Sequence, residues 1–240
     1  MLKVCLNGAR PMRDRVPVTP AQLGEAARAC VEAGASAVHA HPRGDLGRES
    51  LDGELVRVTV AAIRAAAPHV PVGVSTHAGI CPEPRERLAL VRAWPSPEDG
   101  GPDFASVNWH EPGAVDVARA LRSRGIGVEA GIWTPTAAAR LIGTQWPWQV
   151  ERVLVEAIPG LTPGSDGVWA VERILTALGR QPAPVLVHGE ERWAWPVLRW
   201  AQQHGYATRI GLEDTLVDEE GLRVRSNTEL VRAALAVRHP

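Results

Sequence analysis

The chain alternates eight times between a short apolar segment and a longer segment whose apolar residues recur at helical spacing. Short apolar runs bounded by turn residues are typical of strands in a parallel sheet, and parallel strands need a crossover, usually a helix, between them. The predicted strands are residues 2–7, 36–41, 70–75, 103–108, 126–130, 152–157, 185–188 and 207–210. The predicted helices span about 20–33, 51–67, 84–93, 112–124, 135–142, 165–178, 191–204 and 226–237.

Even spacing and short connections favour an α/β fold of the (β/α)8 TIM-barrel type over an open doubly wound sheet. The length of 240 residues suits such a barrel, and no low-complexity tract or linker marks a domain boundary. No Gly-x-Gly-x-x-Gly motif follows the first strand and no phosphate-loop signature occurs, which argues against a dinucleotide or a nucleoside triphosphate as ligand. We therefore expect a single TIM-barrel catalytic domain over residues 1–240.

The charges nearly cancel, with 26 basic and 27 acidic residues. A formal net charge of −1 gives no electrostatic reason to expect nucleic acid or an anionic membrane as a partner. The N-terminal apolar run is too short for a signal peptide, and no later segment approaches the roughly 18 apolar residues of a membrane span. Three cysteines without paired or metal-binding spacing are typical of a reducing compartment, so we expect a cytoplasmic protein.

Polar side chains gather at the carboxyl ends of the predicted strands, where the active site of a barrel lies. They are Asn7, His39, His41, Arg43, Ser75, Thr76, His77, Ser106, Asn108, Glu129, Glu156, His188, Glu190, Arg209, Glu213 and Asp214. His77 and His188 are either ligands or acid–base groups, or hydrogen-bonded residues of the barrel wall. Glu156 and Glu190 either bind an amino group on the substrate or pair with some of the many arginines.

His39 and His41 end the second predicted strand, in the segment Val38-His39-Ala40-His41-Pro42-Arg43. Because side chains alternate faces along a strand, the two imidazoles project the same way and can bind one metal ion together. A catalytic ion usually takes three protein ligands, so the pair alone is equally consistent with a polar rim at a strand end.

Glu213 is the candidate third ligand. In a closed barrel the eighth and second strands flank the first, and even-numbered strands share layers, so Glu213 can approach the histidines. Two histidines and a carboxylate favour zinc, since nothing in the chain demands redox chemistry. Arg209 falls near Asp214 at strand spacing and can hold that carboxylate ionised as a general base. By itself, the acidic pair Glu213-Asp214 is equally consistent with a solvated loop.

Six segments carry a wider pattern: Val38-His39-Ala40-His41-Pro42-Arg43, Val74-Ser75-Thr76, Ala105-Ser106-Val107-Asn108, Val128-Glu129, Arg209-Ile210-Gly211-Leu212-Glu213-Asp214 and Ser226-Asn227-Thr228-Glu229-Leu230-Val231. Their order and spacing resemble the beta-keto acid cleavage enzymes, the family typified by 3-keto-5-aminohexanoate cleavage enzyme. Asn7-Gly8-Ala9 and Pro17-Val18-Thr19-Pro20 also look like the start of that family.

The resemblance implies a zinc-dependent acyltransferase and carbon–carbon lyase on a TIM barrel. Such an enzyme takes a beta-keto acid with acetyl-CoA as co-substrate, and retro-Claisen cleavage yields acetoacetate and a new CoA thioester. Carried over residue by residue, it implies His39, His41 and Glu213 as the zinc (Zn2+) ligands. The candidate catalytic residues are Asp214, Arg209 and Glu129, and Glu129 is also a polar contact to the substrate. The candidate substrate-binding residues are Ser75, Thr76, Ser106, Asn108 and Arg43.

The chain departs from the family pattern in three ways. It is shorter than typical members, Thr76 is followed by His77-Ala78-Gly79 where glycines are expected, and Thr215 follows the acidic pair where asparagine is usual. These changes fall near the expected substrate and CoA surfaces. The alternatives are a zinc hydrolase, in which water is the nucleophile, or another metal-dependent carbon–carbon lyase on the same barrel. A requirement for acetyl-CoA separates the first hypothesis from hydrolysis.

Trp193, Trp195 and Trp200 lie on the seventh predicted helix, on the outside of the barrel. Large apolar residues on an outer surface are typical of subunit interfaces. We therefore expect a homo-oligomer, either a dimer or a tetramer.

Overall fold

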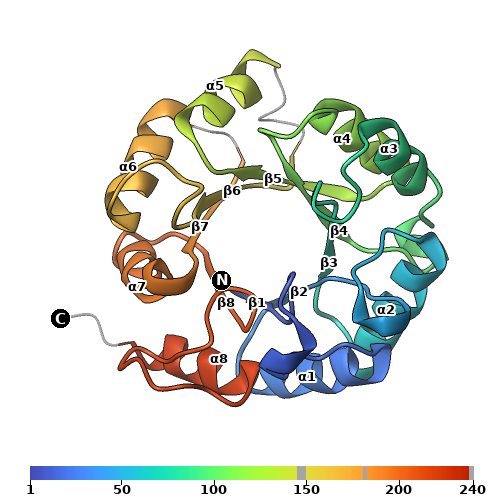
Figure 1. The fold of residues 1–240 in the computed structure, drawn as a ribbon, viewed down its shortest axis with the longest axis horizontal. Coiled ribbons are helices and arrows are strands. Elements are labelled where there is room, and N and C mark those ends of the chain that lie inside the picture. Colours follow the sequence, from blue (N-terminus) through green and yellow to red (C-terminus); the bar gives the residue numbers. More distant parts are fainter. Residues whose placement is uncertain (145–149, 181–182, 238–240) are drawn as a thin grey trace.

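In the computed structural model, which describes residues 1–144, 150–180 and 183–237, eight parallel strands form a ring enclosed by eight α-helices (Figure 1). The strands are β1 (Leu2–Cys5), β2 (Ala37–Ala40), β3 (Val72–Ser75), β4 (Phe104–Asn108), β5 (Gly127–Ile132), β6 (Arg152–Ala157), β7 (Val185–Gly189) and β8 (Thr208–Ile210). The helices are α1 (Pro20–Glu32), α2 (Gly53–Ala66), α3 (Pro84–Arg92), α4 (Ala114–Ser123), α5 (Pro135–Gly143), α6 (Gly167–Leu178), α7 (Ala194–Gln203) and α8 (Asn227–Ala236). The predicted (β/α)8 TIM barrel is confirmed.

The order of the strands places β1 between β2 and β8. Cys5 of β1 lies opposite His39 of β2, and Val4 lies opposite Ile210 of β8. The ring closes through one bridge, at Leu186 of β7, with Ala207 just before β8. This arrangement brings the ends of β2 and β8 to either side of β1, as the proposed approach of Glu213 to the histidines requires.

Side-chain caps fix where several helices begin. The Thr19 hydroxyl accepts a hydrogen bond from Gln22 N, and the Gln22 side chain accepts one from Thr19 N, so a capping box opens α1 ahead of Pro20. Thr134 caps α5 ahead of Pro135 in a similar way, through a bond from Ala137 N. These caps define the ends of loops that form the carboxyl-end mouth of the barrel.

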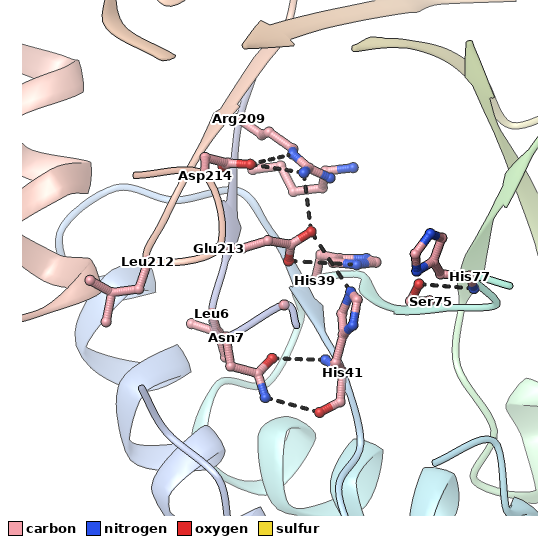
Figure 2. Close-up of polar contacts among 12 residues, drawn as sticks. Leu6, Asn7, His39, His41, Ser75, His77, Arg209, Leu212, Glu213 and Asp214 are labelled. Carbon is pink, nitrogen blue, oxygen red and sulfur yellow. Dashed lines mark hydrogen bonds and ion pairs between the residues drawn. The ribbon is translucent and has the colours of Figure 1, made fainter. Parts of the chain in front are cut away.

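The alternation of faces along β2 separates the core from the site. Val38 and Ala40 are fully buried in the apolar core. His39 and His41 project the other way, toward Glu213 (Figure 2). The same strand therefore serves packing with one set of side chains and chemistry with the other.

A buried ionic cluster fills another part of the barrel interior. Lys3 of β1 is hydrogen-bonded to Glu129 of β5, and Arg152 Nη1 of β6 donates to Glu129 Oε1 at 2.8 Å. Because β1 and β5 are not neighbours in the sheet, the contact between Lys3 and Glu129 crosses the interior. Arg152 also lines a hollow with Pro71 and residues that precede the strands, at the amino end of the barrel.

Trp193, Trp195 and Trp200, which were expected on the outer surface of the barrel, are instead buried or half-buried within the chain. Trp193 and Trp195 are only 4% and 6% exposed, because they pack into the core of their own chain. Trp200 is half-buried and stacks on His204 and Tyr206. The homo-oligomer therefore stays a prediction with less support from α7.

Among the described residues, no helix combines the length and the apolar character that crossing a membrane would need.

Candidate active site

A cavity of about 360 Å³ opens at the carboxyl ends of the strands. Most of the strands, and the loops that follow them, contribute to its wall. Its lining consists of Ala9, Arg10, Pro11, His39, His41, Ser75, His77, Ser106, Asn108, Trp133, Leu154, Glu156, Ile158, Leu161, Glu190, Glu191, Arg209 and Glu213.

His39, His41 and Glu213 converge on one side of this cavity (Figure 2). His39 Nε2 lies 3.9 Å from Glu213 Oε2, and His41 Nε2 lies 3.7 Å from Glu213 Oε1. One ligand atom from each of the three residues lies within 4.8 Å of the other two. Two imidazole nitrogens and a carboxylate oxygen at this separation form a donor set that can hold one divalent ion.

The protonation state of His39 is compatible with metal binding. Burial and the neighbouring His41 lower the pKa of His39 well below its ordinary value, so His39 is a neutral imidazole, the form that binds metals. Glu213 Oε2 is buried and has no hydrogen-bond partner among the described residues. A carboxylate oxygen left unpaired beside a neutral imidazole is what an ion at this position would complete.

Two asparagines hold the ligand-bearing segments against β1. The Asn7 side chain donates to the His41 carbonyl and accepts from His41 N, both at 2.9 Å (Figure 2). Asn227 donates to the Leu6 carbonyl at 2.9 Å and accepts from Leu212 N at 2.8 Å. The backbones beside His41 and Glu213 are thus both tied to the loop after β1. Asn7 was predicted among the strand-end residues, whereas Asn227 was noted only as part of a family motif.

Gly8 lets this loop pass under Glu213. Its φ is +50°, a left-handed conformation that favours glycine. A Cβ added at Gly8 would also lie 3.0 Å from both Cβ and the carboxyl carbon of Glu213. The glycine of the Asn7-Gly8-Ala9 motif is therefore required by the close approach of the predicted third ligand.

Glu49 is a residue that sequence reasoning missed. Its carboxylate is hydrogen-bonded to His41 Nδ1, which leaves His41 Nε2 directed toward Glu213. A bridge between Arg43 and Glu49 folds the loop after β2 back onto itself, so Glu49 returns to the strand end. Burial lowers the pKa of His41, but the charge of Glu213 and the bond to Glu49 outweigh burial and raise it.

A second network lies behind the ligand cluster. Arg209 Nη2 donates to Asp214 Oδ1 at 2.8 Å and to Glu213 Oε1 at 3.1 Å. Buried His188 is placed between two carboxylates, with Nε2 at 3.1 Å from Glu156 Oε2 and Nδ1 at 3.5 Å from Asp214 Oδ1. Arg209 and Asp214 are thus paired as predicted, and His188 proves to be hydrogen-bonded inside the wall.

The two carboxylates of this network have opposite pKa shifts. Burial raises the pKa of Asp214 and outweighs the opposing effect of Arg209. Burial also acts to raise the pKa of Glu156, but the hydrogen bond from His188 and the charges of His188 and Arg209 lower it to about 2. Glu156 is therefore ionised at neutral pH and already has a partner.

Three of the candidate substrate-binding residues, Ser75, Ser106 and Asn108, line the cavity. Thr76 does not, since its hydroxyl donates to the Ser106 carbonyl at 2.7 Å. Arg43 is also directed elsewhere, and its guanidinium donates to the carbonyls of Gly8, Arg10 and Gly47.

Glu129 is not brought together with the other candidates. Its carboxylate is fully buried and bonded to Lys3 and Arg152, and it is absent from the cavity wall. Asp214 is also fully buried beneath the cavity wall, where its carboxylate contacts Arg209 and His188.

The mouth of the cavity has an ion pair that the sequence did not suggest. Arg10 Nη2 lies 2.7 Å from Glu191 Oε1, and Arg10 Nε donates to the Leu212 carbonyl at 3.0 Å. Glu191 has a φ of +51°, an uncommon left-handed conformation for a residue with a side chain. These contacts join the loops that follow β1, β7 and β8.

The fold and the site define a (β/α)8 barrel with a His–His–Glu cluster able to hold a divalent ion at its catalytic end. The family model for beta-keto acid cleavage enzymes matches residues 1–239, and the chain belongs to this family. The resemblance seen in the sequence is thereby confirmed.

Curated relatives span most of the chain. A 3-keto-5-aminohexanoate cleavage enzyme of Acetoanaerobium sticklandii is 25% identical over 228 residues, 90% of this chain and 82% of the relative. A 3-oxoadipate:acetyl-CoA acetyltransferase of Cupriavidus necator is 26% identical over 249 residues, 99% of this chain and 87% of the relative. Among solved structures, an N-acetylmannosamine-6-phosphate 2-epimerase from Clostridium perfringens aligns with a TM-score of 0.57 at 14% identity, covering 89% of this chain and 87% of that one. At that identity, the likeness concerns the barrel fold alone.

Proposed function

We propose that this protein is a zinc-dependent beta-keto acid cleavage enzyme, which converts a beta-keto acid and acetyl-CoA into acetoacetate and a new CoA thioester. The observation that carries the proposal is the convergence of His39, His41 and Glu213 in a chain that belongs to this family. The names of the relatives support both halves of the reaction, since one cleaves a keto acid and another transfers an acetyl group from acetyl-CoA.

His39, His41 and Glu213 would hold the zinc ion. A zinc ion bound there supplies Lewis acidity that polarises the keto group of the substrate and makes the carbon between keto group and carboxylate more acidic. Glu49 orients His41 through its Nδ1, and Arg209 holds Glu213 from the other side. His41 and Glu213 are therefore positioned by hydrogen bonds before any substrate arrives.

Asp214 is the proposed base, and Arg209 is its partner. Asp214 takes the proton from the substrate carbon between keto group and carboxylate, and its raised pKa suits a group that must also give the proton back. Because Asp214 lies beneath the wall, a shift of the Arg209 and Asp214 pair on substrate binding is part of this proposal. Ser75 of β3, and Ser106 and Asn108 of β4, supply polar contacts to the substrate from the cavity wall.

The carbanion then forms a carbon–carbon bond with the acetyl carbonyl of acetyl-CoA, and the carbon–sulfur bond breaks to release the CoA thiolate. The thiolate adds to the original keto carbon of the substrate. Cleavage of the bond between that carbon and its neighbour yields the new CoA thioester. The departing two carbons of the substrate, now joined to the acetyl group, recover the proton and leave as acetoacetate.

Metal analysis and an acetyl-CoA-dependent assay test the proposal together. Purified protein should contain about one zinc per chain and form acetoacetate only when both a beta-keto acid and acetyl-CoA are present. Glu213→Ala should lose both zinc and activity, whereas Glu32→Ala, which alters an exposed ion pair on α1, should keep both. Retention of zinc and activity by Glu213→Ala would refute the assigned ligand set. Turnover without acetyl-CoA would instead support a hydrolase.

We further propose that the protein is cytoplasmic and forms a homo-oligomer, a dimer or a tetramer. The location is supported by the cysteine pattern in the sequence, and the three cysteines are buried thiols in the structure. A monomeric mass in solution at micromolar concentration would refute the oligomer.

A further inference from the structure

The cavity holds more acidic than basic side chains, and a single guanidinium lies against most of the acidic ones. Arg209 Nη2 lies 2.8 Å from Asp214, 3.1 Å from Glu213, 3.7 Å from Glu190 and 3.9 Å from Glu156. One positive charge cannot neutralise four carboxylates in a buried site, so the others need partners of their own.

Most of these carboxylates have such a partner. Asp214 receives two hydrogen bonds from Arg209, and Glu156 is hydrogen-bonded to His188. Glu213 faces the two histidines of the proposed metal site. At the mouth, a fifth carboxylate, Glu191, is paired with Arg10 at 2.7 Å.

Glu190 lacks a comparable partner. Within the described residues, its side chain makes no hydrogen bond, and its nearest cation is Arg209 at 3.7 Å, which is already bonded to Asp214 and Glu213. Burial raises the pKa of Glu190 well above its ordinary value; the charge of Arg209 acts to lower it, and the negative charges of Asp214, Glu156 and Glu213 act to raise it further. The backbone is fixed by a bond from Glu190 N to the Ala157 carbonyl, so the loop holds the carboxyl group at the wall.

Glu190 lies in the part of the cavity where the far end of a bound substrate would extend. Its Oε1 and the Oε1 of Glu213 lie against the same nitrogen, Arg209 Nη2, at 3.7 and 3.1 Å. A beta-keto acid held near Glu213 by its keto and carboxylate oxygens would extend its remaining carbons into the same cavity. Leu154, Ile158 and Leu161 provide apolar wall for those carbons.

We propose that Glu190 binds a protonated amino group on the carbon chain beyond the keto group, so that the substrate is an amino-substituted beta-keto acid. This inference rests on the proposed function and names the substrate class for it. The names of the relatives leave the class open, because one refers to a substrate with an amine and another to a dicarboxylic acid. A second carboxylate would add negative charge beside Glu190, and the nearby Arg10 is already occupied by Glu191 and the Leu212 carbonyl.

Three six-carbon substrates that share the beta-keto acid group test this inference: 3-keto-5-aminohexanoate, 3-ketohexanoate and 3-oxoadipate. With acetyl-CoA, the wild-type protein should have a kcat/KM for the amino compound about tenfold or more above that for either of the others. Glu190→Gln should lose most of that preference. Glu32→Gln, which removes a carboxylate from the exposed ion pair on α1, should retain the preference.

Equilibrium binding separates failure of this inference from failure of the proposed function. Calorimetry without acetyl-CoA should give tighter binding of the amino compound by wild-type protein, and a preference weakened by Glu190→Gln, whether or not turnover occurs. Equal or tighter binding of 3-ketohexanoate or 3-oxoadipate would overturn the inference, as would an undiminished preference in a folded Glu190→Gln protein. Absence of turnover with all three compounds, alongside the expected binding preference, would count against the reaction but support the role of Glu190.

Discussion

Replacement of Glu49 by glutamine tests whether the His–His–Glu cluster is built as a metal site. The substitution keeps the size of the side chain but removes the charge that His41 Nδ1 contacts. In known sites, a carboxylate bonded to the far nitrogen of a ligating histidine fixes the orientation of the ring and raises its basicity. Removing such a partner typically weakens metal binding about 10–100-fold, or roughly 1.4–2.8 kcal/mol.

The environment of Glu49 leads us to expect a loss of zinc affinity within this range for Glu49→Gln. The Glu49 side chain is 18% exposed and His41 is 7% exposed, so water screens the contact only partly. Loss of the Glu49 charge also removes one of the two carboxylate effects that raise the pKa of His41, leaving Glu213 as the other. The imidazole becomes a weaker base, and its ring loses the bond that holds Nε2 toward Glu213.

The measurement is a competition titration of metal-free protein with zinc and a chromophoric chelator at neutral pH. Glu54→Gln is the matched control, because it removes a carboxylate at the exposed start of α2 that pairs with Arg57. A zinc affinity of Glu49→Gln within about twofold of wild type would refute the reasoning, provided that circular dichroism confirms folded protein. The control should be indistinguishable from wild type.

Three further predictions concern the packing and charge around the site. Gly8→Ala should weaken zinc binding and destabilise the fold by about 1–3 kcal/mol, because the new methyl group meets Glu213; thermal unfolding and the zinc titration measure both effects. Glu129→Gln should cost about 3–5 kcal/mol in urea unfolding, since it leaves buried Lys3 without its carboxylate; unchanged stability with a raised KM would instead favour a substrate contact. The lowered pKa of Glu156 stabilises the folded state above pH 4.5, its ordinary value, and this contribution should be lost as the pH falls toward 2; Glu156→Gln should flatten the measured stability in that window.

Much of the fold and the ligand cluster could be predicted because both depend on regular spacing. Alternation of strand and helix fixed the barrel, and barrel closure then placed Glu213 beside His39 and His41 without any knowledge of loop structure. Glu49 could not be predicted, because it reaches His41 only through a loop that folds back and forms a bridge between Glu49 and Arg43. No periodic pattern marks such a turn, so a carboxylate eight residues after His41 is indistinguishable from a solvated one.

Glu129 illustrates how a small error in a predicted strand boundary changes the predicted position of a residue, from the carboxyl end of a strand to its interior. The strand expected at residues 126–130 runs instead over Gly127–Ile132, so Glu129 is its third residue rather than a residue near its end. In register, Glu129 lies opposite Arg152, the first residue of β6. Each residue advances a strand by about 3.3 Å, so an error of two residues displaces a side chain by more than the length of a hydrogen bond. A polar residue at a strand end and one inside a strand have the same signature in sequence, and the contacts of Glu129 with Lys3 and Arg152 are what distinguish them.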